Sequence, residues 1–119
     1  MKNEPSSKSK PIGIIILAAG ASRRMGASKQ LLKIDDQTLI ERAVALTQAL
    51  DNQKTVVVLG ANADKIIPYI PQQEEVNVIF NKDWQQGMGT TLKKGMEFFL
   101  KQTEQFNAVI VMEKFHSLF

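Results

Sequence analysis

The chain has 119 residues, of which 44% are hydrophobic and 23% charged, and it contains no cysteine. This length allows one domain with a modest core, and the missing thiols exclude disulfides, thiolate zinc sites and cysteine nucleophiles. The formal net charge is +3, but Lys2, Lys8 and Lys10 against Glu4 place most of it at the start of the chain. The rest is close to neutral, so the charge pattern argues against a nucleic-acid partner.

The first segment, MKNEPSSKSKP (1–11), is polar and lacks the apolar stretch of a secretory signal. We therefore expect residues 1–11 to form a disordered leader. The longest apolar run, residues 12–21, is too short to span a bilayer. Together these features predict a cytoplasmic protein without a membrane partner.

Strand-like and helix-like segments alternate after the leader. The β-branched run at 12–17 predicts a strand that is buried on both faces, followed by a glycine-containing loop. QLLKI (30–34) predicts a short extended piece, and DDQ (35–37) predicts a turn. Asp35 and Asp36 in this turn are interpreted as turn residues rather than as a metal-binding pair.

A helix is expected to begin at Thr38, because Thr38 and Glu41 have the spacing of a capping box. Its apolar stripe is predicted at four positions: Leu39, Ala43, Leu46 and Leu50. TVVVLG (55–60) predicts a second buried strand that ends in glycine. Residues 62–70 predict a short helix that is interrupted by prolines.

VNVIF (76–80) predicts a third strand, and a loop follows at 81–89. Thr90 or Thr91 is expected to cap the next helix. The apolar face of that helix is predicted at four positions: Leu92, Met96, Phe99 and Leu100. AVIVM (108–112) predicts a fourth strand.

This alternation predicts a largely parallel sheet with helices on both faces. Ligands of such sheets bind outside the carboxyl ends of the strands. Three segments are therefore expected on one rim, namely 17–29, 81–91 and the residues after Met112. The fourth strand is expected to present an exposed outer edge.

The segment LAAGASRRMGASK (17–29) has the composition of an anion site. Its small residues let a ligand approach the backbone, consecutive amides can form a nest for an oxyanion, and Arg24 and Lys29 supply positive charge. Gly20 and Gly26 do not have the spacing of a Walker A loop or of a G-x-G-x-x-G motif. The alternative is a solvated basic loop whose glycines serve only for turning.

Two motifs resemble the MobA-like nucleotidyltransferases. The pattern LAAGxSxRMGxxK (17–29), directly after a strand, is most similar to the molybdenum-cofactor cytidylyltransferase branch. The pattern NxxWxxGMGxTLxxG (81–95) resembles the family's loop after the third strand. The resemblance extends from about residue 12 to residue 112.

The resemblance implies an α/β fold of the Rossmann-like GT-A type, mostly parallel with helices on both faces, within a domain at 12–119. It implies transfer of a nucleotidyl group, CMP in preference to GMP, from CTP or GTP to a phosphorylated small-molecule acceptor such as molybdopterin cofactor. Pyrophosphate would be released.

The resemblance also assigns roles by motif position. The backbone amides that would hold the nucleotide belong to Leu17, Ala18, Ala19 and Gly20. Arg24 would bind the triphosphate, and Lys29 would neutralise charge as the α-phosphate is attacked; these two are the candidate catalytic residues. Gly87 and Thr91 would line the base and ribose pocket, with Asn81 nearby.

The family holds Mg²⁺ with an aspartate just beyond the fourth strand. Here the strand runs into EKFHSLF (113–119), where that aspartate is absent. Glu113 is the nearest carboxylate, either a replacement ligand or a charge at a frayed strand end. His116 has no expected catalytic partner. Trp84 either stacks on a ligand or closes its loop against the core.

The tail at 113–119 leads us to expect a domain that is incomplete at its C-terminus. Three interpretations stay open: a nucleotidyltransferase, a non-catalytic nucleotide-binding remnant, and a truncated fragment without turnover.

Overall fold

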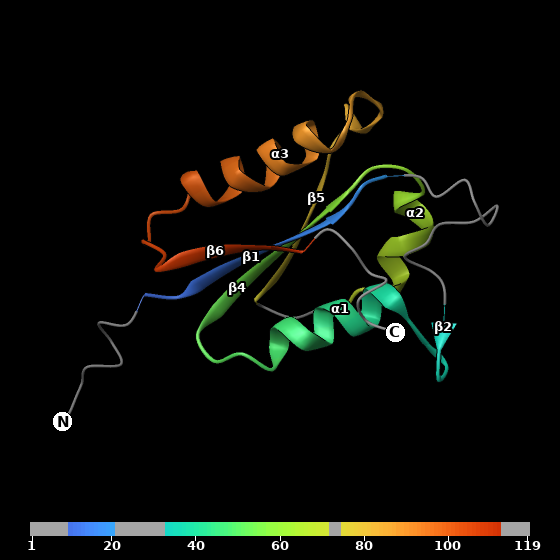
Figure 1. Ribbon diagram of the computed structural model, residues 1–119, viewed down its shortest axis with the longest axis horizontal. Helices are drawn as coiled ribbons and strands as arrows, with labels where there is room; N and C mark the ends of the chain where they lie inside the picture. The colour runs from blue at the N-terminus through green and yellow to red at the C-terminus, as the bar shows by residue number, and fades with distance from the viewer. Residues whose placement is uncertain (1–9, 21–32, 72–74, 113–119) are drawn as a thin grey trace.

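The computed structural model describes residues 10–20, 33–71 and 75–112. Its centre is a four-stranded parallel sheet in the order β5–β4–β1–β6 (Figure 1). The strands are β1 (Ile12–Ala18), β4 (Gln53–Leu59), β5 (Val76–Phe80) and β6 (Ala108–Met112). The predicted parallel sheet is thus confirmed, and the bounds of β5 and β6 agree with those expected from the sequence.

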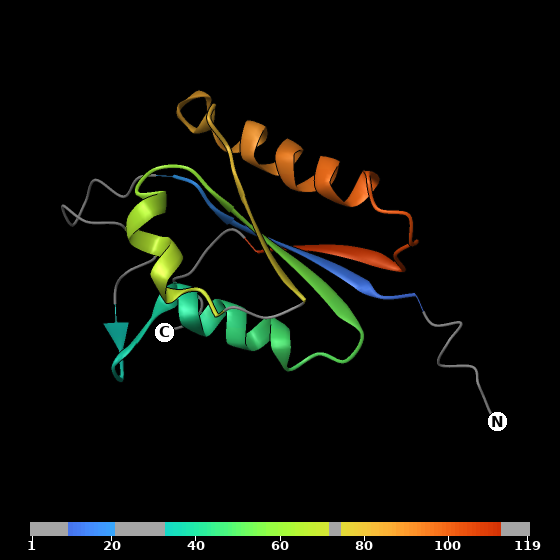
Figure 2. The ribbon, with the colours of Figure 1, turned by 180° about the vertical axis from the view of Figure 1, so that it is seen from behind.

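Helices cover both faces of the sheet, as predicted. α1 (Leu39–Gln48) and α2 (Ala63–Ile66), which continues into the short 3₁₀ helix η3 (Ile67–Tyr69), lie on one face, and α3 (Met88–Leu100) lies on the other (Figures 1 and 2). This α/β arrangement is the predicted fold class.

Successive side chains of β1 supply the two cores, because neighbouring residues of a strand point to opposite faces. Ile14 and Ile16 join the core beneath α1 and α2, whereas Ile15 and Leu17 join the core beneath α3. Ile15 and Ile16 have no exposed surface. Burying a side chain of this size contributes about 1.5–3 kcal/mol to stability. The β-branched run therefore stabilises the strand through burial on both of its faces.

Two glycines allow α3 to lie close to β1. A Cβ atom added to Gly95 of α3 would lie 2.6 Å from Cγ2 of Ile15, and one added to Gly13 of β1 would lie 3.0 Å from the ring of Phe99. Phe99 also meets Phe106 edge-on, with ring centroids 4.8 Å apart. The core on this face therefore combines aliphatic side chains with Phe99, and the two glycines allow its close packing.

The predicted capping box of α1 is confirmed. The Thr38 hydroxyl accepts a hydrogen bond from the Glu41 backbone N–H at 3.2 Å, and Glu41 Oε1 accepts one from the Thr38 backbone N–H at 2.8 Å. Both bonds satisfy amides that the first turn of a helix leaves unpaired.

The apolar stripe predicted for α1 is only half right. Leu39 and Ala43 are buried, but Leu46 is 52% exposed and Leu50, beyond the end of the helix, is 44% exposed. The buried side continues instead through three other residues: Ile40, Val44 and Thr47. The chain ends α1 at Gln48, so the stripe does not continue far enough to bring Leu50 under the sheet.

The start predicted for α3 is wrong. The helix begins at Met88 after Gly87, and neither Thr90 nor Thr91 is its N-cap. The predicted apolar face is also wrong in part. Phe99 is buried, but Leu100 is 79% exposed and Met96 is 37% exposed. The reason is positional, since α3 packs on β1 and β4 through Phe99 in its last turn, whereas Leu100 lines the open groove beside β6.

The shorter elements agree with the sequence analysis. β2 (Lys33–Ile34) and β3 (Gln37–Thr38) form an antiparallel hairpin. Asp35 and Asp36 between them have φ angles of 54° and 67°, the left-handed pair that a tight hairpin turn requires. The predicted helix at 62–70 is present as α2 and η3.

β5 and β6 are the edges of the sheet within the described part of the chain. Ile110 of β6 is 45% exposed and Phe80 of β5 is 57% exposed, which agrees with the exposed edge expected for the fourth strand. In these described residues, no helix has the length and apolar character needed to cross a membrane. Most of the predicted leader, residues 1–9, lies outside them.

Candidate functional site

The carboxyl ends of β1, β4 and β5 lie together at one end of the sheet, next to α2 and the start of α3 (Figure 1). We call this end of the sheet the carboxyl edge. The backbone joins them there. Ala61 N–H donates to the carbonyl of Ala19 at 2.8 Å, and Asn81 N–H donates to the carbonyl of Leu59 at 2.7 Å. The prediction that the segments after the first and third strands share one rim is therefore confirmed for their described parts.

Trp84 brings the two segments into contact. It begins the 3₁₀ helix η4 (Trp84–Gln86) in the loop after β5. A Cβ atom added to Gly60 would lie 2.6 Å from Cβ of Trp84 and 2.9 Å from Cβ of Ala19. Only a glycine at the end of β4 leaves room for both neighbours. Of the two interpretations of Trp84, the geometry supports closure of the loop against the core.

Asn81 organises the same loop from inside. Its side chain is wholly buried, and its amide nitrogen donates to the hydroxyls of Thr90 and Thr91, each at 2.9 Å. Its carbonyl oxygen accepts from the Asp83 backbone N–H at 3.0 Å. Both N–H groups of the carboxamide and one acceptor site of its oxygen are thus used within the protein.

Thr90 extends these bonds to the start of α3. Its hydroxyl lies 2.8 Å from the carbonyl of Gly87 and 3.0 Å from that of Asp83. Thr90 is the third residue of α3 and therefore lies inside the helix and not at its N-cap. We refer to the set of residues joined in this way as the Asn81 network: Asn81, Asp83, Gly87, Thr90 and Thr91.

The glycines at this edge face open space. Gly87 has a φ angle of 116°, a conformation that side-chain-bearing residues rarely adopt. Among the described residues, a Cβ atom added to Gly20, Gly87 or Gly89 would meet nothing within 4 Å. The backbone at these positions is therefore accessible to a ligand from the carboxyl edge.

The other predicted site residues divide into two groups. Leu17, Ala18 and Ala19 are described and have buried side chains, so they could contact a ligand only through their backbone. Arg24 and Lys29, the candidate catalytic residues, lie outside the described residues. Their roles stay predictions.

The described residues do not fit a metal site on their own. Within 10–20, 33–71 and 75–112, no three Asp, Glu, His or Cys side chains gather closely enough to hold a metal ion. Asp64, exposed in the first turn of α2, and Asp83 are carboxylates on this side of the sheet, whereas a divalent cation prefers several oxygen ligands together. Glu113, the candidate ligand, lies outside the described residues.

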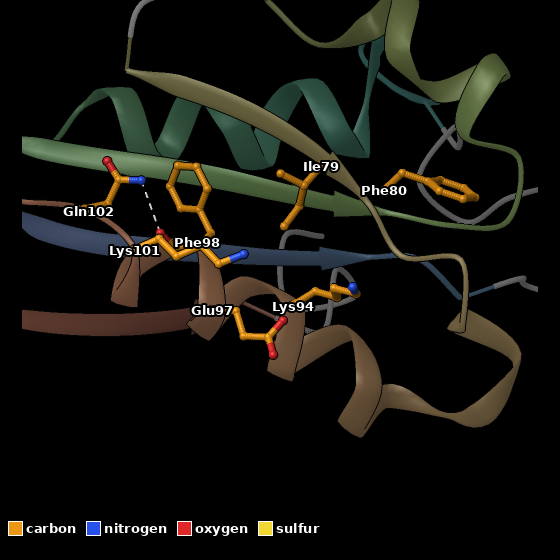
Figure 3. Close-up of a pocket in the computed structure, with 7 residues that line it drawn as sticks. All are labelled: Ile79, Phe80, Lys94, Glu97, Phe98, Lys101 and Gln102. Atoms are coloured by element: carbon orange, nitrogen blue, oxygen red, sulfur yellow. Dashed lines mark hydrogen bonds between the residues drawn. The ribbon is translucent and has the colours of Figure 1, made fainter.

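Two open grooves lie along α3, away from these glycines. One, of about 300 Å³, separates α3 from β5 and is lined by Ile79, Phe80, Lys94, Glu97, Phe98, Lys101 and Gln102 (Figure 3). Gln102 closes its end by donating to the carbonyl of Phe98 at 3.1 Å. The other, of about 420 Å³, lies between the last turn of α3 and β6. Neither groove is lined by a residue predicted for the nucleotide site.

Comparison with known proteins identifies the family. The model of the MobA-like NTP transferase domain matches residues 14–112. The chain belongs to this family. The match covers β1 from Ile14 onward, the loop that follows β5, and β6, so the family expected from the two sequence motifs is confirmed.

Two named relatives of this MobA-like chain are longer proteins. Nicotine blue oxidoreductase of Paenarthrobacter nicotinovorans is 35% identical over 82 residues, which cover 68% of this chain and 40% of that protein. Bifunctional protein GlmU of Thermobifida fusca (strain YX) is 25% identical over 108 residues, which cover 89% of this chain and 22% of that protein. The chain thus spans less than half the length of either relative.

Solved structures share the fold. A nucleotidyl transferase from Methanothermobacter thermautotroptrophicus matches with a TM-score of 0.70 at 19% identity, covering 87% of this chain and 50% of that one. Rv0371c from Mycobacterium tuberculosis, in complex with manganese, matches with a TM-score of 0.59 at 20% identity and the same coverage. These likenesses support the α/β nucleotidyltransferase fold.

Sequence reasoning missed several residues that shape the site. Gly60 was interpreted only as a strand end and Thr90 only as a cap, and the role of Gly95 was not predicted. A glycine ending each of two apolar runs, in LAAG and VVLG, was a signal that the backbone comes close to something there. The sequence did not indicate that this neighbour is Trp84.

Proposed function

We propose that this chain is the nucleotide-binding part of a nucleotidyltransferase, which transfers a nucleotidyl group from an NTP to a phosphorylated acceptor. Membership of the MobA-like NTP transferase family supports this assignment. The observation that carries it is the junction at the carboxyl edge, where Gly60 and Trp84 hold the end of β1 against the loop after β5. Gly20, Gly87 and Gly89 border this junction with their backbone open.

The reaction is a displacement at the α-phosphorus of the NTP. An oxygen of the acceptor's phosphate forms a bond to that phosphorus, the bond to the bridging oxygen breaks, and its electron pair leaves with pyrophosphate. Such reactions depend on positioning and on stabilising charge that develops on the leaving oxygens. We assign binding of the triphosphate to Arg24 and neutralisation of charge at the α-phosphate to Lys29.

The nucleotide would be held by the backbone of residues 17–20, with its base and ribose towards Gly87 and Thr91. CTP is favoured over GTP, and a molybdopterin-type acceptor over others, because the pattern at 17–29 is most similar to the cytidylyltransferase branch. Mg²⁺ is expected to accompany the triphosphate. The manganese complex of Rv0371c supports a divalent cation.

Thermal unfolding tests the nucleotide site. A ligand that binds only the native state raises the midpoint by mass action, so Mg²⁺·CTP should raise the midpoint more than Mg²⁺·GTP. Arg24→Ala and Lys29→Ala should each weaken CTP binding by about 10- to 100-fold, since each removes a charged phosphate contact.

The matched control is Lys101→Ala, which removes an exposed lysine next to the C-terminal end of α3 and should leave CTP affinity unchanged. Equal affinity in the wild type, Arg24→Ala and Lys29→Ala would reject the assignment of this loop. Release of pyrophosphate in the presence of a phosphorylated acceptor distinguishes an enzyme from the alternative, a nucleotide-binding remnant. The remnant would bind CTP but would release no pyrophosphate.

A further inference from the structure

We propose that Asn81 is a positioning residue, which shapes the nucleotide site through Thr90 and Thr91 and does not itself contact the nucleotide. This inference rests on the proposed function, and it gives Asn81 a different role from the one suggested by its motif position. It follows from three properties of the Asn81 network: its burial, the points of the loop that it joins, and its connection to β1.

The carboxamide of Asn81 has both of its donors engaged within the protein and is shielded from a ligand. Its two N–H groups donate to the hydroxyls of Thr90 and Thr91, and its oxygen accepts from Asp83 N–H. The side chain has no exposed surface. A nucleotide could reach this side chain only if the loop around it opened, and opening would leave buried polar groups unpaired at a cost.

The network joins points that are far apart along the loop. Asn81 follows β5, whereas Thr90 and Thr91 lie in the first turn of α3, so two side-chain bonds close the loop over 9 and 10 positions. The Thr90 hydroxyl reaches back to the carbonyl of Gly87 at 2.8 Å. The left-handed conformation of Gly87 is thereby fixed before any ligand arrives.

The network also has a fixed position relative to β1. Trp84 lies within the loop that Asn81 closes, and it packs on Gly60, which in turn contacts Ala19. The backbone of the first segment and that of Gly87 are therefore held in one arrangement. A preorganised site binds more tightly, because the protein does not have to be ordered when the ligand binds.

The first test needs no nucleotide. Asn81→Ala and Thr90→Val should speed amide hydrogen exchange within residues 82–91 by about tenfold or more. In these variants, local opening of the loop no longer has to break the hydrogen bonds of the network, so it costs less free energy. Thr90→Ser keeps the hydroxyl and should restore wild-type exchange. Unchanged exchange in Asn81→Ala would overturn the positioning role.

The second test is the affinity for Mg²⁺·CTP. Asn81→Ala and Thr90→Val should weaken binding by about tenfold, and Thr90→Ser should bind like the wild type. Faster exchange with unchanged affinity would also overturn the inference. A wild-type chain that binds no nucleotide would instead overturn the proposed function, and the exchange data would still decide whether the network holds the loop.

Two control variants lose comparable bonds elsewhere. Asn77→Ala removes a half-buried amide that donates to the carbonyl of Thr55 at 3.4 Å. Thr47→Val removes a buried hydroxyl that donates to the carbonyl of Val44 at 2.7 Å in α1. Both should alter stability while leaving CTP affinity and exchange at 82–91 unchanged. A similar loss of affinity in these variants would show that Asn81 acts only through overall stability.

Discussion

The two faces of the sheet are built by different means. Beneath α1 and α2, β1 contributes Ile14 and Ile16 to a core of branched aliphatic side chains. Beneath α3, the same strand meets a helix that approaches closely because Gly13 and Gly95 leave space for Phe99 and Ile15. The packed core on the first face contributes mainly to the stability of the fold. The packing on the second face also sets the distance between α3 and the sheet, and the first turn of α3 borders the candidate nucleotide site.

This difference implies that stability and nucleotide affinity can be separated by mutation. A cavity beneath α1 lowers the free energy of unfolding but does not move α3. A side chain that pushes α3 away from β1 changes the position of Gly87 and the Asn81 network as well. Variants on the two faces should therefore show distinct pairs of effects.

The largest effect is expected from Ile16→Ala, on the face of α1. Truncating a fully buried isoleucine lowers the free energy of unfolding by about 2–5 kcal/mol, to be measured by urea unfolding. The matched control is Ile110→Ala, which truncates a half-exposed isoleucine at the edge strand β6 and should cost about 1 kcal/mol or less. CTP affinity of the folded Ile16→Ala protein should stay unchanged, and a large loss would break the distinction between the faces.

A smaller loss of stability, but with weaker CTP binding, is expected from Gly95→Ala. The added Cβ would lie 2.6 Å from Cγ2 of Ile15, and such overpacking costs about 1–3 kcal/mol. Alanine's higher helix propensity offsets about 1 kcal/mol of this cost. Combining the variant with Ile15→Ala should give less destabilisation than the sum of the two, as measured by a double-mutant cycle.

Gly89→Ala is the control for stability, because its added Cβ meets nothing within 4 Å. Its free energy of unfolding should be unchanged or higher. If Gly95→Ala binds CTP as tightly as the wild type, the position of α3 does not control the site.

The smallest effect is expected from Thr38→Ala at the start of α1. This change removes one half of the capping box and should lower the free energy of unfolding by about 1 kcal/mol. Thr38→Ser keeps the hydroxyl and should retain most of the stability. CTP affinity should not change in either variant, since the capping box lies on the face opposite to α3. A change in affinity would show that the two faces are energetically coupled.

The sequence allowed correct prediction of those features of the fold that local patterns control. The β-branched runs placed all four strands, and the spacing of Thr38 and Glu41 placed the start of α1. The predictions that were wrong depended on distant contacts. Thr90 has the chemistry of a cap, but α3 already begins at Met88, and the Thr90 hydroxyl bonds to Asn81 from the preceding strand end. Leu100 fits a helical stripe, but it lines the open groove beside β6 and stays 79% exposed.

The site was predictable at the level of segments and not of side chains. Parallel strands bring the loops after β1 and β5 to one edge whatever their sequence, and this expectation was confirmed. The contact of Trp84 with Gly60 depends on how two non-adjacent loops fit together, which no local pattern specifies. Arg24 and Lys29 stay predictions, because they lie outside the described residues.

The position of β1 between its two partners has a consequence for how the chain folds. Ile12 pairs in register with Gln53 on one side and with Ala108 on the other. The first pairing spans 41 positions (53 − 12), and the second spans 96 (108 − 12). Closing long loops costs entropy before any contact compensates for it, and such non-local pairing slows folding. During synthesis, β1 can therefore dock on β4 well before β6 emerges, and the β6 side of β1 is the last part of the sheet to be covered.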